Sequence, residues 1–262
     1  MSAPGLIVAR KEIVDHLRDR RSLLSAVAYA LMGPAIVLLV SFSPKSRGES
    51  LPAVMVGMMS VFALVSAFTG GMNVAMDAMS GERERRSLLP LLMTPVRRRD
   101  VVIGKWIAAS LFALAALAVN LAGLVAVLAL RLPATLAAQA PTLAAWAILG
   151  LAPLALLAAA LEILVASFSR TMKEAGTSLM LVAFVPMFVG MFLVFFPVSA
   201  GVWTAVPVVG QQIVIDAGMR GSPAPLLQVI ALAAVTVGCA LAPLAAAERM
   251  IGRDDAAASP AA

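Results

Sequence analysis

Residues 106–130 read WIAASLFALAALAVNLAGLVAVLAL, a run without a single charged side chain. About 20 predominantly apolar residues are enough for a helix to cross a membrane. Five further stretches meet the same requirement, at about 23–42, 53–76, 142–168, 176–196 and 225–247. The sequence therefore predicts an all-α polytopic membrane protein with six transmembrane helices in one domain over 23–250.

The composition agrees with a chain that lies mostly in lipid. Of its 262 residues, 61% are hydrophobic and 13% are charged, whereas soluble domains average about 25% charged residues. One cysteine and one histidine argue against a disulfide framework and against a His/Cys metal site. We expect this chain to hold no metal and no cofactor. We also expect no nucleic-acid partner, because its net charge of +6 is placed beside the predicted spans.

The basic residues predict the orientation of these spans. When both termini share one side of the membrane, 16 of the 20 Lys and Arg residues fall on that side. Basic residues are enriched in cytoplasmic loops, so we expect both termini and the 77–105 loop in the cytoplasm. The first span begins near Leu23, behind a long charged segment, and is therefore expected to be retained rather than cleaved as a signal peptide.

The sequence also predicts the structure of the segments outside the spans. Residues 1–22 place Leu6, Ile13 and Leu17 near helical spacing, which predicts an amphipathic helix at the membrane surface. That helix acts either as a basic anchor or as an elbow that also touches a cytosolic partner. The partly apolar loop 197–224 predicts short re-entrant or external helices, and residues 251–262 a disordered tail. The basic residues assigned to the interface helix are Arg10, Lys11, Arg18, Arg20 and Arg21.

The segment 80–106, SGERERRSLLPLLMTPVRRRDVVIGKW, is the long charged stretch between two spans. Its leucines interleave with its arginines, and Ser80 is placed as the N-cap of a helix that Pro95 ends. A loop whose arginines only enforce topology would explain the charge but not the leucines. A docking surface for another protein explains both. The residues assigned to it are Glu82, Glu84, Arg85, Leu88, Leu89, Leu91, Leu92 and Pro95.

This segment, together with ARKEIVDHLRDRRSLL at 9–24, resembles the ABC type-2 transport permeases. Their pattern is roughly G-E-x-E-x-G-T-L-E-x-L-L-x-x-P followed by G-K, and the chain departs from it at Arg86 and Pro90, where the family has Gly and Glu. RTMKEAGTSLM and VPVVGQQIVIDAGMRG further resemble the NatB-like, sodium-exporter branch, without its large external insert. The matching positions are Gly81, Glu82, Glu84, Leu88, Leu91, Leu92, Pro95, Gly104 and Lys105.

The resemblance implies a permease subunit of an ATP-driven exporter in a bacterial inner membrane. Two such subunits, expected to be identical, would pair above two ATPase subunits, with 80–95 as the coupling helix. ATP and Mg²⁺ would bind the ATPase. The one Gly-Lys pair, Gly104–Lys105, is followed by Trp106, so the sequence lacks the G-x-x-x-x-G-K-[ST] phosphate loop, and we expect that the chain itself is not an enzyme. The substrate is expected to be a lipid, another amphiphile or a drug, or sodium by resemblance.

Polar residues within spans are candidates for a substrate path, because such groups are costly in lipid. Asn73, Asp77, Asn120 and Glu162 are of this kind. Glu162 either pairs with Arg170, Lys173 or another basic residue at the inner end, or it serves a cation site or the translocation path. A secondary transporter or channel that works without ATP is the alternative function, and Glu162 would be its main coupling residue. An intramembrane enzyme is disfavoured, since the sole His16 lies outside the spans.

Overall fold

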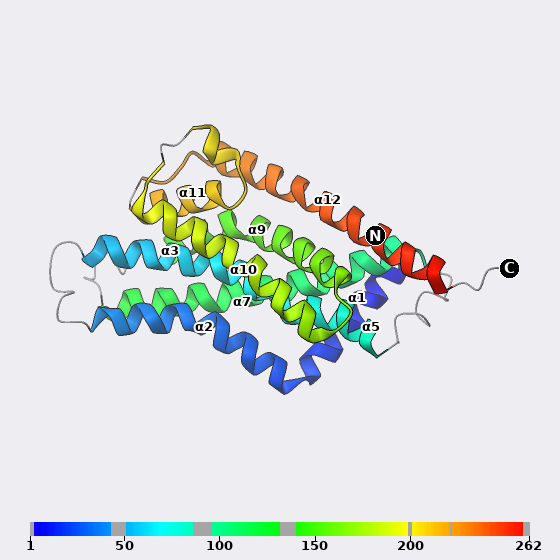
Figure 1. The fold of residues 1–262 in the computed structure, drawn as a ribbon. Coiled ribbons are helices and arrows are strands. Elements are labelled where there is room, and N and C mark those ends of the chain that lie inside the picture. The colour runs from blue at the N-terminus through cyan, green and yellow to red at the C-terminus, as the bar shows by residue number, and fades with distance from the viewer. Residues whose placement is uncertain are drawn as a thin grey trace.

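The computed structural model of the chain describes residues 3–42, 51–85, 96–131, 140–198, 201–220 and 222–258. These residues form a bundle of helices whose two chain ends lie at the same end of the molecule (Figure 1). We call this end the terminal end. The α-helices are α1 (Ala3–Arg18), α2 (Arg20–Ser41), α3 (Leu51–Thr69), α4 (Met72–Met76), α5 (Glu82–Glu84), α7 (Arg98–Arg131), α9 (Ala140–Phe168), α10 (Met172–Phe195), α11 (Val209–Met219) and α12 (Leu226–Ala258).

Within the part of the chain that the structure describes, six helical stretches are long and apolar enough to cross a membrane, which confirms the predicted number of spans. They are Ser22–Ser41, Val56–Glu84, Arg98–Leu130, Ala144–Phe168, Met172–Phe195 and Leu226–Ile251. The bounds of two spans differ from the prediction. The second span ends at Glu84 and not at 76, and the third begins at Arg98 and not at 106. The helices continue into charged sequence because Glu82 and Lys105 pair with each other inside the protein.

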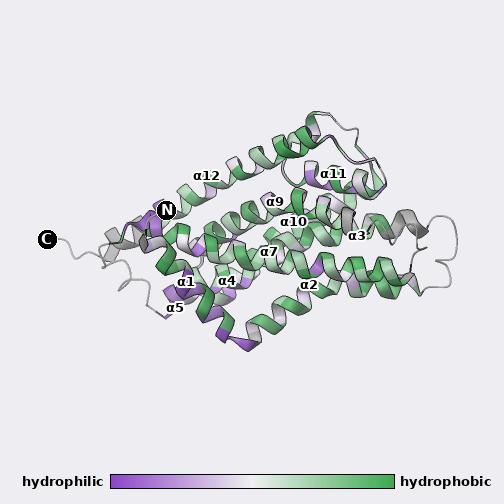
Figure 2. Cartoon of the chain, turned by 180° about the vertical axis from the view of Figure 1, so that it is seen from behind, coloured by the Kyte–Doolittle hydropathy of each residue, from purple (hydrophilic) through white to green (hydrophobic). Residues whose placement is uncertain are grey.

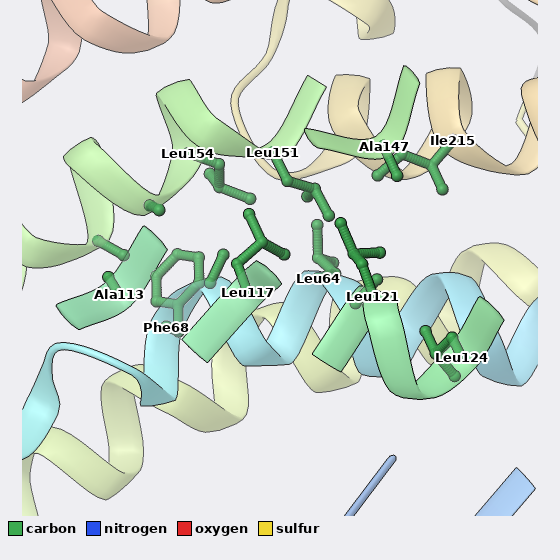
Figure 3. Packing of buried hydrophobic residues seen from close by; sticks show 14 of the residues in the cluster. Leu64, Phe68, Ala113, Leu117, Leu121, Leu124, Ala147, Leu151, Leu154 and Ile215 are labelled. Atoms are coloured by element: carbon green, nitrogen blue, oxygen red, sulfur yellow. The ribbon is translucent and has the colours of Figure 1, made fainter. Parts of the chain in front are cut away.

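The centre of the bundle is formed by α3, α7 and α9. Figure 3 shows Leu64 and Phe68 of α3 meeting Leu117 of α7 and Leu151 and Leu154 of α9. Small residues such as Ala113, Ala155 and Ala158 are fully buried between them, and small side chains allow close approach of helices in a membrane. The central three helices therefore form a firm frame on which the outer helices pack.

The helix α1 packs across the beginning of α7 at the terminal end, where polar residues gather (Figure 2). The two backbones come very close: a Cβ atom on Gly104 would lie 2.7 Å from the carbonyl oxygen of Gly5 and 2.8 Å from Cβ of Val8. Glycine at 104 is therefore a requirement of this packing. The amphipathic helix predicted at the N-terminus is present, but one of its faces is covered by protein.

The opposite end carries short helices between α10 and α12, as predicted for the loop 197–224. A 3-10 turn, Val202–Ala205, precedes α11. Gln211 of α11 donates a hydrogen bond to Thr236 of α12 at 2.7 Å, and Gln212 donates one to Ser60 of α3 at 2.7 Å. These bonds fix α11 inside the bundle.

The last helix, α12, continues to Ala258. The helix thus covers 251–258 of the segment for which the sequence predicts a disordered tail, where alanines favour a helix; the rest of that segment, 259–262, lies outside the described residues.

Candidate functional site

The most deeply buried charge among the described residues belongs to Lys105, whose side chain is fully covered. Its Nζ donates hydrogen bonds to Oε1 of Glu12 at 2.9 Å, to Oε2 of Glu82 at 2.7 Å and to the carbonyl oxygen of Ala78 at 2.6 Å. Three acceptors use the three donors of an ammonium group. The lysine of α7 thus ties α1 to the end of the second span.

Lys11 completes this arrangement from α1. Its Nζ lies 2.5 Å from Oε1 of Glu82 and 3.2 Å from Oε1 of Glu12. Partial burial lowers the pKa of Lys11, but the hydrogen bond that Lys11 donates to Glu82 and the charges of Glu12 and Glu82 outweigh this and raise the pKa above its ordinary value. The charges of the two lysines and the two glutamates cancel. We call these four residues, Lys11, Glu12, Glu82 and Lys105, the ion cluster.

The two residues after Glu82 join the second span to α9 and α10. Arg83 donates hydrogen bonds to the carbonyl oxygens of Ser167 at 2.7 Å, in the last turn of α9, and of Ser169 at 2.9 Å, just after it. Glu84 accepts a hydrogen bond from the backbone N–H of Met172 at 2.8 Å, at the first turn of α10. A carboxylate at a helix N-terminus and a guanidinium at a C-terminus both suit the helix dipole.

A π-helical turn, Asp77–Gly81, lies between α4 and α5. Ser80 belongs to this turn and donates a hydrogen bond to the carbonyl oxygen of Ala166 at 2.9 Å. Its expected role as an N-cap is therefore wrong, because the helix of the second span runs on through it. Asp77 forms an ion pair with Arg85 across the same turn. Such π-turns occur frequently at functional sites.

The segment 77–85 therefore contacts α1 and α7 through the ion cluster, α9 through Ser80 and Arg83, and α10 through Glu84. Of the residues assigned to the docking surface, the structure brings Glu82, Glu84 and Arg85 to one place. The others, Leu88, Leu89, Leu91, Leu92 and Pro95, lie outside the described residues. Glu12 was not singled out from the sequence, and Lys105 was identified as a matching position of the family pattern and as one of the cytoplasmic basic residues, without a partner. The Gly104–Lys105 pair was the available signal, since a glycine beside a buried lysine permits the close approach of α1.

The basic residues of the interface helix separate into two groups. Lys11 is part of the ion cluster, whereas Arg10, Arg18 and Arg20 are exposed. The side chain of Arg21 lies outside the described residues. Exposed apolar residues, Leu6, Ile7 and Leu17, lie on the same helix, which gives it the composition of a surface-lying membrane helix.

Two of the four polar residues predicted in the spans join helices by hydrogen bonds. Asn73 donates to Oγ of Ser25 at 3.1 Å, and the buried Asn120 donates to the carbonyl oxygen of Ala30 at 2.8 Å. Asp77 pairs with Arg85, as described above. Glu162 is 2% exposed, and the ion pairs of the described residues do not include it, so its expected pairing with Arg170 or Lys173 is not formed.

A polar cavity of about 370 Å³ opens beside these residues at the terminal end. Asp15, His16 and Asp19 line it from the junction of α1 and α2, and Asn73 and Asp77 line it from the second span. His16 is buried, contacts Oγ of Ser22 at 2.9 Å and packs its edge against Phe112. Burial lowers the pKa of His16 below its ordinary 6.5, although the charges of Asp77, Asp19 and Glu12 act in the opposite direction.

The fold and the site define a class: a six-span helical membrane protein in which many of the charged groups form a connected network at the terminal end. The family to which the chain belongs is that of the ABC-2 family transporter proteins, whose model matches residues 6–255. The resemblance seen in the segment 80–106 is thereby confirmed.

Three curated relatives carry related names. The chain is 36% identical over 143 residues to the ABC transporter permease protein NatB of Bacillus subtilis, covering 50% of this chain and 35% of that protein. It is 31% identical over 101 residues to the probable ABC transporter permease protein NosY of Pseudomonas aeruginosa and to that of Stutzerimonas stutzeri, covering 38% of this chain and 36% of each. The aligned part thus spans about a third of the length of each relative.

Proposed function

We propose that this chain is the permease subunit of an ATP-driven exporter, coupled to a separate ATPase through residues 80–95. The observation that carries the proposal is the attachment of the segment 77–85 to α1, α7, α9 and α10. The chain enters residues 86–95 directly from this segment. A displacement of residues 86–95 would therefore act on four helices at once, which is what a coupling segment must do.

The ion cluster suits this role because it resists partial separation. Removing one partner from a buried ion pair is strongly destabilising, since the other charge remains uncompensated in a poorly solvated place. The segment 77–85, α1 and α7 therefore move together or not at all. In the proposed assembly two copies of this chain pair, two ATPase subunits bind at their terminal ends, and ATP and Mg²⁺ bind those subunits. The terminal ends then lie on the cytoplasmic side of a bacterial inner membrane.

An apolar or amphiphilic substrate is favoured by a hollow beside α10. Its volume is about 680 Å³, within the range of about 300–1,000 Å³ typical of small-molecule sites. Phe188, Phe192 and Phe195 of α10 line it together with Trp203 and Val209, and the three phenylalanines are more than half exposed. Aromatic walls of this kind bind apolar ligands by burial of their surface.

Transport by the purified permease and its ATPase in proteoliposomes tests this function. With a fluorescent phospholipid analogue inserted in the membrane, we expect vanadate-sensitive translocation that depends on ATP. The double variant Phe188→Ala/Phe192→Ala should lower the stimulation of ATP hydrolysis by the analogue several-fold, while Phe168→Ala, an exposed phenylalanine outside the hollow, should not. Flux without ATP would support the secondary transporter or channel instead, and ATP-dependent movement of sodium alone would contradict the proposed substrate.

A further inference from the structure

The second span is interrupted beside the frame of the bundle. Helix α3 ends at Thr69 and α4 begins at Met72, with Gly70 and Gly71 between them. Both glycines are pressed against α7: a Cβ atom on Gly70 would lie 2.6 Å from Cβ of Ala116, and one on Gly71 would lie 2.8 Å from the carbonyl oxygen of Ala109. Only glycine fits at either position, so the interruption is closely packed against α7.

The carboxyl group of Glu162 points at this interruption from α9. A Cβ atom on Gly71 would lie 2.8 Å from Oε2 of Glu162. This oxygen is buried and has no hydrogen-bond partner among the described residues. The side chains packed together around this level are apolar, namely Val74, Ala75, Ala109, Ala159, Ile163 and Ala166.

Charges on the neighbouring elements are engaged elsewhere or lie at the terminal end. Asp77 pairs with Arg85 after α4, and Lys105 of α7 belongs to the ion cluster. Arg83 binds carbonyl oxygens at the end of α9, and Glu174 of α10 accepts a hydrogen bond from the backbone N–H of Arg170. Among the residues whose side chains the structure describes, the remaining charged ones on the packed elements are Arg98, Arg99 and Asp100 on α7, Lys173 on α10, and Glu248 and Arg249 on α12. None of these residues forms a described ion pair with Glu162.

An ionised carboxylate in such a place is costly, whereas a neutral carboxylic acid is tolerated. We propose that Glu162 is a proton-binding site linked to the transport cycle. It holds a proton while α9 is packed against the Gly70–Gly71 interruption. When the two separate and water enters, the O–H bond breaks, its electron pair stays on the carboxylate and the proton passes to water. Repacking takes a proton back.

The force that separates α9 from the Gly70–Gly71 interruption comes from the proposed function, and the inference rests on it in this respect. The interruption and the segment 77–85 belong to the same span, so movement of the coupling segment reaches Gly71 through α4 and the π-helical turn. The proton-binding site itself depends only on the geometry around Glu162. The two can therefore be tested separately in one preparation.

Infrared difference spectroscopy of the permease in liposomes tests the resting state. At neutral pH the wild-type protein should show the carbonyl stretch of a protonated carboxylic acid, and Glu162→Gln should lose that band while remaining folded. Glu174→Gln, which changes an exposed carboxylate, should leave the band unchanged. A wild-type spectrum without a band that Glu162→Gln removes would overturn the proposal. Loss of the band on adding sodium would also overturn it and assign the site to a metal ion.

The second measurement uses the complex with its ATPase, trapped with ATP and vanadate. We expect the Glu162 band to disappear in the trapped state and to return when vanadate is washed out. An identical band in both states would overturn the link to the cycle. A preparation that contains no ATPase, or does not hydrolyse ATP, would show instead that the proposed function is wrong, while the resting-state band would still report on the site.

Discussion

Lys105 is the residue on which the terminal end depends most strongly. Replacing it with Met, of similar length and without charge, leaves Glu12 and Glu82 buried with only the exposed Lys11 beside them. Such a loss costs about 3–5 kcal/mol, and we expect the variant to unfold at a markedly lower temperature in mild detergent. Arg99→Met, which removes an exposed charge near the start of the same helix, is the control. Equal unfolding temperatures for the two variants would contradict the importance of the ion cluster.

His16 gives the protein a predictable response to acid. Because burial lowers the pKa of His16 in the folded protein, the unfolded chain takes up a proton first as the pH falls. Stability should therefore be complete above the unfolded pKa of about 6.5 and decrease as the pH falls below it. His16→Gln keeps a hydrogen-bonding side chain but cannot titrate. Thermal unfolding measured across this range should show a smaller loss for the variant, and an unchanged pH dependence would contradict the assignment.

The packing of α1 on α7 is a property of whole elements, and Gly104 controls it. Gly104→Ala forces α1 away, because the new Cβ atom would meet the backbone of Gly5. Overpacking of this kind costs about 1–3 kcal/mol. Gly238→Ala is a matched control, since a Cβ atom there meets nothing within 4 Å and alanine favours the helix. Thermal unfolding should separate the two variants, with Gly104→Ala less stable and Gly238→Ala equal to the wild type or better.

Arg83 should separate ATP hydrolysis from transport. Arg83→Gln loses charge-assisted hydrogen bonds to the carbonyl oxygens of Ser167 and Ser169, worth about 1.5–3 kcal/mol each. The coupling segment would keep its docking residues and the hydrogen bond of Ser80 to Ala166, but it would lose the Arg83 part of its attachment to α9. We expect ATPase binding to persist and substrate translocation per ATP to fall at least several-fold. Equal coupling in the variant and the wild type would show that α9 is not driven through this contact.

The sequence predicted the membrane-spanning helices better than the contacts between their residues. Runs of apolar residues found all six spans, because hydropathy over about 20 residues is a local property. The ends of the second and third spans were misplaced, since Glu82 and Lys105 are tolerated there only through a contact 23 residues apart in the chain. Glu12 was missed for the same reason: its role depends on how α1 crosses α7. The orphaned Glu162 was correctly singled out as costly, but the expected basic partner is not present among its described contacts.

The molecule as a whole has its charged network at the terminal end and mostly apolar helices elsewhere, with further hydrophilic residues on α11 (Figure 2). The second, third and fourth spans are the most buried of the six, whereas little of α10 is buried. A frame of α3, α7 and α9 with attached outer helices allows movement at the terminal end to be passed along whole helices. We propose that residues 80–95 receive this movement from an ATPase.

The most direct test is to purify the tagged chain from its native membrane in mild detergent and identify what accompanies it. The account predicts an ATPase with a phosphate-binding loop in a near-equal amount, and vanadate-sensitive ATP hydrolysis by the sample. It also predicts that Leu88→Asp/Leu92→Asp abolishes this association while the permease keeps its thermal unfolding temperature. A folded permease that brings no ATPase in several detergents, or a double variant that assembles normally, would contradict the account.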